Sequence, residues 1–193
     1  MTAERAKLGF VEFVLDQFQF LKDVYSFQCS YKDNYCVCYD SQNVKVCIYH
    51  ERISYELYLE MGLKHDNVQV HTAMLTDILE LAGVHDQRAK FLQASSRESV
   101  QAVVDTLAML TQKYAYDVLS GNEATFRALE TLKQERTERL LKMDMLAGIE
   151  EKAQNAWRAK DYAKVISLYA PVEGNLNEIQ TKRLEYAKSK ASE

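Results

Sequence analysis

Cysteine is the residue type whose spacing in this chain comes nearest to a chemical site. All four cysteines lie in one short stretch, at Cys29, Cys36, Cys38 and Cys47. Thiolates gathered on one surface bind zinc, and one activated thiolate can act as a nucleophile or redox centre. Structural zinc sites, however, usually take pairs two to four residues apart on tight loops, whereas a C-x-C pair on a strand is held about 6.5–7 Å apart. Buried structural cysteine is the preferred interpretation, with a metal site and a reactive thiol as alternatives.

The patterns of the common enzyme classes do not occur elsewhere in the sequence. The glycines are too widely separated to build a phosphate-binding loop or a dinucleotide fingerprint. There is neither a G-x-S-x-G nor an H-E-x-x-H motif, and the four histidines are scattered over expected loops and element ends. We therefore expect a non-enzymatic protein without a cofactor.

The charge balance of 24 basic and 28 acidic residues contains no run of Lys and Arg suited to phosphates, so nucleic acid is not an expected partner. Neither a signal-peptide core at the amino end nor an apolar stretch of about 20 residues is present, which argues against membrane insertion. The crowded cysteines are not distributed like a secreted disulfide framework. The sequence thus predicts a cytoplasmic protein with free thiols.

The elements that must position the cysteines are a helix and a small sheet. Apolar residues spaced three and four apart predict a helix over 4–22. Period-two alternation of β-branched and aromatic residues over about 24–60, interrupted by polar turns, predicts a four-stranded antiparallel meander. The expected class is α+β, with an N-terminal helix, this meander and a mainly helical C-terminal half.

A hairpin at Ser41 and Gln42 sets the expected strand register, with Cys36 opposite Cys47. A turn at Asp33 and Asn34 adds Cys29 to the cysteine side. Because both faces are apolar, we expect helices or another chain to cover both. The alternation defines a Val/Tyr face, made of Val37, Tyr39, Val44, Val46 and Ile48, and a Cys/Tyr face, made of Cys36, Cys38, Cys47 and Tyr49.

The last expected strand, Ile53 to Glu60, alternates apolar and polar residues as a half-exposed edge does. Tyrosine favours protein interfaces, since it buries an apolar ring while its hydroxyl stays hydrogen-bonded. The residues that we expect to contact a partner protein are Tyr55, Glu56, Tyr58 and Glu60.

After a loop from Gly62 to Asn67 the chain is expected to be helical. Its predicted helix starts are Thr72, Asp86, Ser95 with Glu98, Asn122, and Asn175 with Glu178. Ion pairs Glu135–Arg139 and Glu138–Lys142 indicate a solvated face on the helix that follows Asn122.

Beyond Gly148, Ala153, Ala156 and Trp157 precede an Asp161–Tyr162 turn and the apolar positions of a second helix. This spacing resembles one tetratricopeptide-like helical hairpin, which implies helix pairing, while a peptide groove needs about three stacked repeats. We expect an α+β domain over 1–147, followed over 148–193 by this hairpin and a terminal helix.

In size, acidity and build the chain resembles bacterial small accessory proteins such as toxin-immunity proteins. The resemblance implies an immunity- or adaptor-like protein that binds another protein through the sheet edge or the aromatic face. One alternative is a thiol- or metal-dependent protein that uses Cys29, Cys36, Cys38 and Cys47. Another is a homo-oligomeric scaffold, in its simplest form a homodimer.

Overall fold

In the computed structural model, residues 5–65, 68–84 and 92–191 are described. The first apolar segment forms two short helices, α2 (Phe10–Gln17) and α3 (Gln19–Tyr25), where the sequence predicted one. The division falls at Phe18, whose φ of −98° and ψ of 16° depart from helical values. The Phe18 side chain is fully buried, so the break places an aromatic ring in the core.

The sheet has five antiparallel strands in sequence order, which confirms the α+β class. The sequence predicted four strands, because Gly62 to Asn67 was interpreted as a loop and Thr72 as a helix cap. Gly62 instead lies within the fourth strand and Thr72 within the fifth. The strands are β1 (Gln28–Lys32), β2 (Cys36–Asp40), β3 (Val44–His50), β4 (Leu57–His65) and β5 (Val68–Met74).

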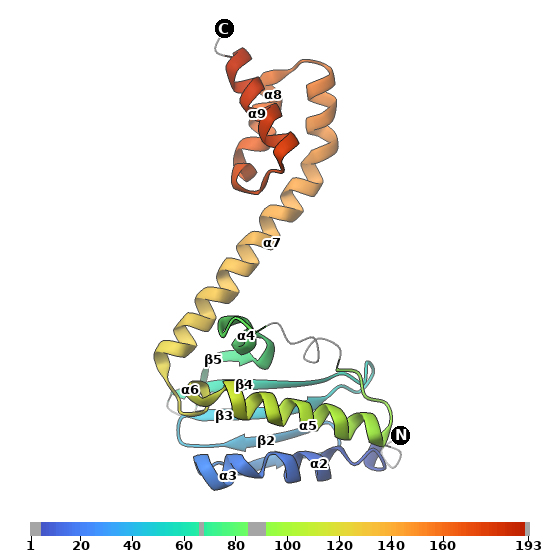
Figure 1. The fold of residues 1–193 in the computed structure, drawn as a ribbon, viewed down its shortest axis with the longest axis vertical. Helices are drawn as coiled ribbons and strands as arrows, with labels where there is room; N and C mark the ends of the chain where they lie inside the picture. The colour runs from blue at the N-terminus through green and yellow to red at the C-terminus, as the bar shows by residue number, and fades with distance from the viewer. Residues whose placement is uncertain (1–4, 66–67, 85–91, 192–193) are drawn as a thin grey trace. The chain divides into compact units, whose positions relative to one another are not determined.

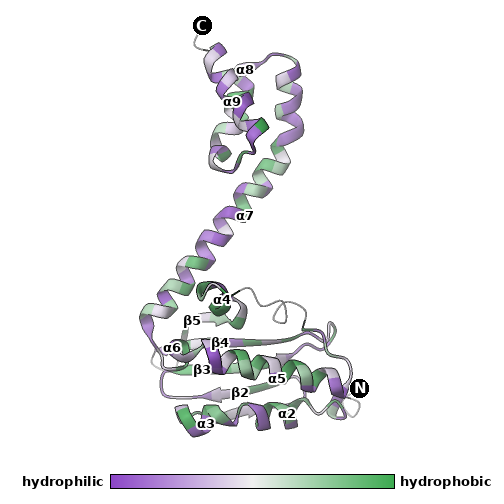
Figure 2. Ribbon diagram, viewed as in Figure 1, coloured by the Kyte–Doolittle hydropathy of each residue, from purple (hydrophilic) through white to green (hydrophobic). Residues whose placement is uncertain are grey.

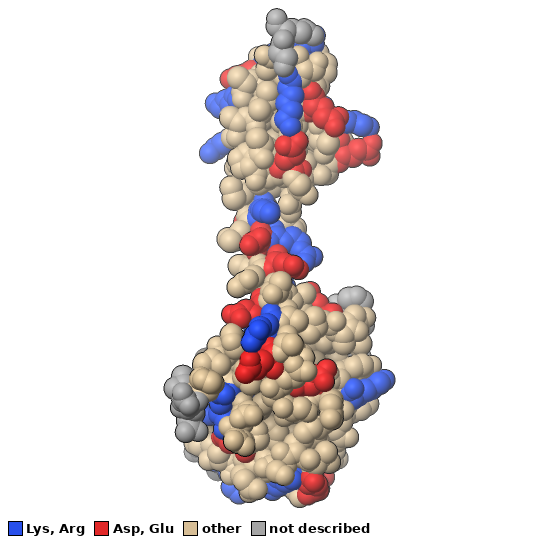
Figure 3. Space-filling model, turned by 90° about the vertical axis from the view of Figure 1, so that its left-hand side faces the viewer, with Lys and Arg blue, Asp and Glu red and all other residues tan. Residues whose placement is uncertain are grey.

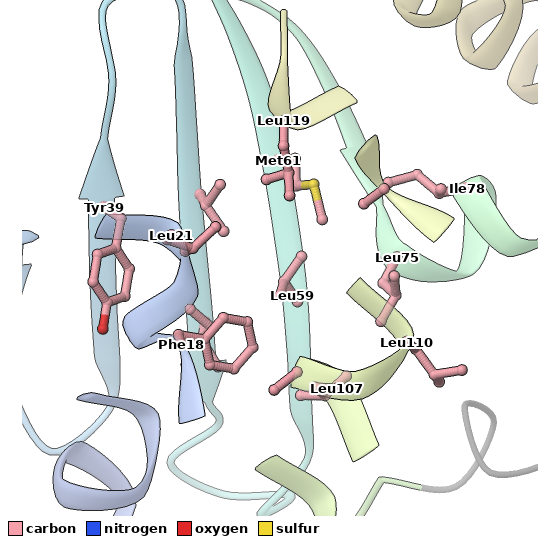
Figure 4. Close-up of a cluster of buried hydrophobic side chains, with 14 of the residues drawn as sticks. Phe18, Leu21, Tyr39, Leu59, Met61, Leu75, Ile78, Leu107, Leu110 and Leu119 are labelled. Atoms are coloured by element: carbon pink, nitrogen blue, oxygen red, sulfur yellow. The ribbon is translucent and has the colours of Figure 1, made fainter. Parts of the chain in front are cut away.

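The main core lies between the Val/Tyr face and the helices (Figure 1). All five residues of that face are at most 1% exposed. Phe18 and Leu21 approach it from the N-terminal helices, and Leu107 and Leu110 approach it from α5 (Arg97–Tyr114), as Figure 4 shows. Among the described residues of this part of the chain, helices cover the Val/Tyr face only. The sequence analysis expected both faces to be covered, by helices or by another chain.

The later helices begin close to the predicted caps. The Ser96 and Ser99 side chains form the reciprocal cap of α5, one residue beyond the predicted Ser95 and Glu98 pair. Asn122 accepts a bond from the amide of Ala124 at the start of α7 (Glu123–Arg158), as predicted. The helix predicted from Asp86 lies outside the described residues. The other helices of this region are α4 (Leu75–Leu81) and α6 (Tyr116–Leu119).

The chain separates into two compact units, residues 1–133 and 134–193, so the boundary falls inside α7 and before the predicted residue 147. Asp161 caps α8 (Tyr162–Tyr169) by accepting a bond from the Lys164 amide. A 3-10 segment, η2 (Ala170–Asn175), leads to α9 (Glu178–Ala191). The cap of α9 is the pair Asn177 and Gln180, two residues beyond the predicted Asn175 and Glu178.

The second unit contains its own small core, in which Ala153, Val165, Tyr169 and Ala187 are fully buried. The middle of α7 alternates in hydropathy along its length (Figure 2), and acidic and basic side chains lie close together on it (Figure 3). Four apolar side chains there, Leu140, Leu141, Met143 and Met145, are each more than half exposed. No helix in the described part of the chain is both long and apolar enough to cross a membrane.

Candidate functional site

The hairpin between β2 and β3 has a longer loop than predicted. Asp40 pairs with Lys45, and the amide of Ser41 donates to the Val44 carbonyl across the loop. Cys38 therefore lies opposite Cys47, and the predicted pairing of Cys36 with Cys47 is wrong. The register differs by two positions, and a shift of two residues leaves every side chain on its own face. The predicted composition of both faces of β2 and β3 is therefore correct.

Cys38 and Cys47 form a disulfide, which corrects the expectation of free thiols. Their Cα atoms lie 4.2 Å apart, as in directly opposed residues of an antiparallel pair. The Sγ of Cys36 lies 3.4 Å from the Sγ of Cys38, although the two cysteines are separated along one strand. This distance is shorter than the separation of about 6.5–7 Å expected for a C-x-C pair on a strand, because the spacing of the Cα atoms does not fix that of the Sγ atoms. All three sulfur atoms lie within 4.8 Å of one another.

Cys29 does not join this cluster, contrary to prediction. It pairs with Tyr39 and packs against the main core, on the other side of the sheet. A bulge between Cys29 and Tyr31 breaks the simple alternation on which the prediction rested. The cluster that could hold a metal ion thus consists of Cys36, Cys38 and Cys47.

The Cys36 thiol is half-buried and chemically unactivated. Burial, with a smaller contribution from the carboxylate of Asp33, raises the pKa of Cys36 to about 11. A thiol with that pKa is almost wholly protonated at neutral pH, and the thiolate is the nucleophilic form. The geometry thus gives no support to a catalytic cysteine at this position.

The expected edge strand, Ile53 to Glu60, is not an edge. Its second half belongs to β4, which pairs with both β3 and β5. The edge strands of the sheet are β1 and β5. The sequence prediction placed an edge at Ile53 to Glu60 because it did not include β5. The β5 edge is crossed by the start of α7, where Glu130 lies 3.2 Å from His71 and the Lys133 ammonium donates to the Thr72 carbonyl.

The four predicted contact residues lie close together but have different surroundings. Tyr55 lies under the Arg5 guanidinium, 3.9 Å from its ring centroid. Glu56 is exposed and forms a β-bridge with Gln93. Glu60 lies opposite Cys47, on the Cys/Tyr face.

Tyr58 connects the Cys/Tyr face to the surface beside it. Its ring stacks on that of Tyr49 with centroids 4.9 Å apart, and its hydroxyl donates to Glu51 at 2.9 Å. Burial and this bond to Glu51 raise the pKa of Tyr58 well above its usual range. The hydroxyl therefore stays protonated and holds the Glu51 carboxylate in place.

A cavity of about 870 Å³ opens beside β4 at this point. It occupies a gap in strand pairing: the Leu57 amide donates to the Leu92 carbonyl, and pairing with β5 begins only at Glu60, opposite Met74. The described charged residues that line it are both acidic, Glu51 and Glu56. The lining comprises Glu51, Ser54, Glu56, Leu57, Tyr58, Leu59, Met74, Leu75, Thr76, Leu92 and Leu107.

A second polar cluster, which the sequence reasoning missed, is buried beside Tyr55. His50, which the sequence placed at an element end, is fully buried. The Arg5 guanidinium contacts its ring and also donates to the carbonyls of Glu51 and Arg52 at 2.7 Å. Through these contacts Arg5 joins the first described residues of the chain to the end of β3. Arg5 gave no sequence signal, because two of its hydrogen-bond partners are main-chain carbonyls and the third, His50, lies 45 residues away in the chain.

No protein-family model, curated protein or solved structure matches this chain.

Proposed function

We propose that this protein binds another protein, and that the β4 cavity receives from it an apolar side chain flanked by a basic residue. The observation that supports the proposal is the composition of the cavity wall among the described residues: leucines, with Glu51 and Glu56 as the charged side chains. Ligand sites typically combine an apolar lining with a few placed polar groups. Neutralising a toxin, as the architectural resemblance implied, would be one instance of this function.

The charge of the wall favours a cationic ligand. Glu51 and Glu56 are exposed, and Glu51 is held by the Tyr58 hydroxyl. Tyr58 and its stacked neighbour Tyr49 also offer aromatic surface to an Arg or Lys side chain. A partner segment that carries Lys or Arg beside Leu, Ile or Met is complementary to both parts of the wall.

The gap in strand pairing favours an extended segment over a helix. Between the Leu92 contact at Leu57 and the start of β5 pairing at Glu60, one side of β4 borders the cavity. An extended peptide can add to such a strand through main-chain hydrogen bonds while its alternate side chains fill a pocket. This binding mode would use Tyr58 and Glu56, two of the four predicted contact residues. The peptide would bind in the gap beside β4, and not along a free edge strand as the sequence predicted.

Selection of random displayed peptides on the intact protein tests the proposal. We expect the selected sequences to share a basic residue next to an aliphatic one. The double variant E51Q/E56Q should bind a selected peptide about tenfold more weakly, because two exposed charge contacts are lost.

The matched control is E135Q/E138Q, which removes two carboxylates of α7 that are not among the described residues of the cavity lining, and should leave the affinity unchanged. Selection of peptides without a basic residue, or equal binding by E51Q/E56Q, contradicts the proposal. Peptides that bind E135Q/E138Q as weakly as E51Q/E56Q would show only a general charge effect and would also contradict it.

A further inference from the structure

We propose that the reduced protein binds one zinc ion through the thiolates of Cys36, Cys38 and Cys47. These three residues gather their sulfur atoms within 4.8 Å of one another, on two adjacent interior strands. The inference concerns the Cys/Tyr face and does not depend on the β4 cavity.

Reduction of the Cys38–Cys47 disulfide places three thiols close together on one face of the sheet. A zinc–sulfur bond of about 2.3 Å places the sulfur atoms of a shared ion about 3.8–4.0 Å apart. The Cys36 and Cys38 sulfurs are 3.4 Å apart, and the Cys47 sulfur is bonded to that of Cys38 until the disulfide is reduced. Small side-chain rotations can therefore bring all three sulfurs to bonding distance while the strands stay paired.

The surroundings are those of a preformed site. Cys38 and Cys47 are 4% and 5% exposed, whereas Cys36 is half-buried and leaves an approach from solvent. Lys45 projects from the same face and offsets part of the negative charge of three thiolates. Within the described residues no carboxylate or imidazole joins the three-sulfur cluster, so solvent fills the fourth position of zinc.

The redox chemistry requires an external reductant. A dithiol donates two electrons and two protons to the Cys38–Cys47 bond, which becomes two thiols, while the dithiol leaves as its own disulfide. Zinc then displaces one proton from each of the three thiols, and three protons are released to solvent. The disulfide form has one thiol at the cluster and lacks the ligands to hold the ion.

Native mass spectrometry of the full chain tests this inference. The protein is reduced with dithiothreitol, freed of reductant by gel filtration under nitrogen, and mixed with one equivalent of zinc sulfate. We expect one bound zinc in the reduced protein and none in the oxidised protein. Cadmium in place of zinc should give the ultraviolet thiolate-to-metal absorption band.

Cysteine variants then assign the ligands. C36S retains the Cys38–Cys47 disulfide, whose formation checks that the variant folds. After reduction, C36S should bind zinc more than about tenfold more weakly than the original protein. Loss of a residue that only hydrogen-bonds to a zinc ligand already lowers the affinity by about tenfold, and loss of a ligand should lower it further. C29S is the matched control and should bind like the original protein, because Cys29 lies on the other face.

Absence of zinc from the reduced chain, equal uptake by the oxidised chain, or undiminished binding by C36S each overturns the inference. Each of these results leaves the peptide-binding test unaffected, because that test uses the oxidised protein and variants of Glu51 and Glu56.

Discussion

The Nε2 atom of His50 lies 2.9 Å from the carbonyl oxygen of Ala94, and so joins the end of β3 to the segment that precedes α5. Since a carbonyl only accepts, Nε2 carries the hydrogen. The Nη1 atom of Arg5 lies 3.1 Å from Nδ1 and 3.0 Å from Nε2, and Nδ1 is the ring nitrogen left to accept from it. The ring is therefore neutral in the folded protein, and protonation would remove one of these two bonds.

This arrangement predicts loss of stability in mild acid. Burial lowers the pKa of His50 below 6.5, and the charge of Arg5 acts in the same direction. The unfolded chain then binds more protons, so the contribution is complete above pH 6.5 and is lost as the pH falls below it, by at most about 1.4 kcal/mol per pH unit. Urea denaturation at pH 7 and pH 5 should show this difference.

In H50Q the fall in stability between pH 7 and pH 5 should be smaller than in the original protein, whatever the variant's stability at pH 7. An unchanged pH dependence in H50Q would show that His50 is not the group that titrates.

Alkylation should report the unactivated state of Cys36. Its pKa of about 11 predicts that reaction with iodoacetamide is slow at pH 8 and still accelerates between pH 9 and pH 11. Measurement in the C29S background isolates Cys36 from the other free thiol. A rate that levels off below pH 9 would contradict the structure. Because the folded-state pKa is raised, the same group contributes stability that is present below pH 9 and is lost toward pH 11.

Glu150 should be important to the stability of the second unit. Its carboxylate accepts bonds from Gln154 at 2.8 Å, Gln180 at 2.6 Å and Tyr169 at 3.2 Å, and so links three helices. Burial alone would raise the pKa of Glu150, but these bonds lower it below 4.5. The stability that they provide is present above pH 4.5 and is lost as the pH falls through the folded-state value.

E150A should lower the free energy of unfolding of this unit by about 1–3 kcal/mol, since bonds to a charged group are removed. Trp157, the sole tryptophan of the chain, lies in the same unit and reports its unfolding by fluorescence. E151Q changes the exposed neighbouring carboxylate and should have little effect. Equal destabilisation by the two variants would refute the role of this network.

Two glycines make a matched pair for a test of backbone conformation. Gly9 has a φ of +73°, and a Cβ there would meet the Arg97 guanidinium and the Phe13 ring. G9A should therefore destabilise the first unit by about 1–3 kcal/mol. Gly148 lies within α7, and a Cβ there meets nothing within 4 Å. G148A should be neutral or stabilise by up to about 1 kcal/mol, as thermal denaturation would show.

Much of the fold follows from local patterns in the sequence. Alternation assigned the faces of β2 and β3 correctly even though the hairpin register was wrong, because the error was an even number of residues. The cap at Asn122 was recognised because a short polar side chain must satisfy the first helical amides. Such features depend on neighbours along the chain and so can be inferred from it.

The candidate sites depend on contacts between distant segments. The Cys38–Cys47 disulfide required the exact loop length at Ser41, and the position of Cys29 depended on a bulge. The β4 cavity lies where pairing with β5 stops at Glu60 and the Leu92 carbonyl bonds only to the Leu57 amide. By itself the sequence determined which residues alternate, cap and turn. Tertiary structure decided which cysteines meet and where the sheet ends, because pairing of distant strands depends on the packing of the whole core.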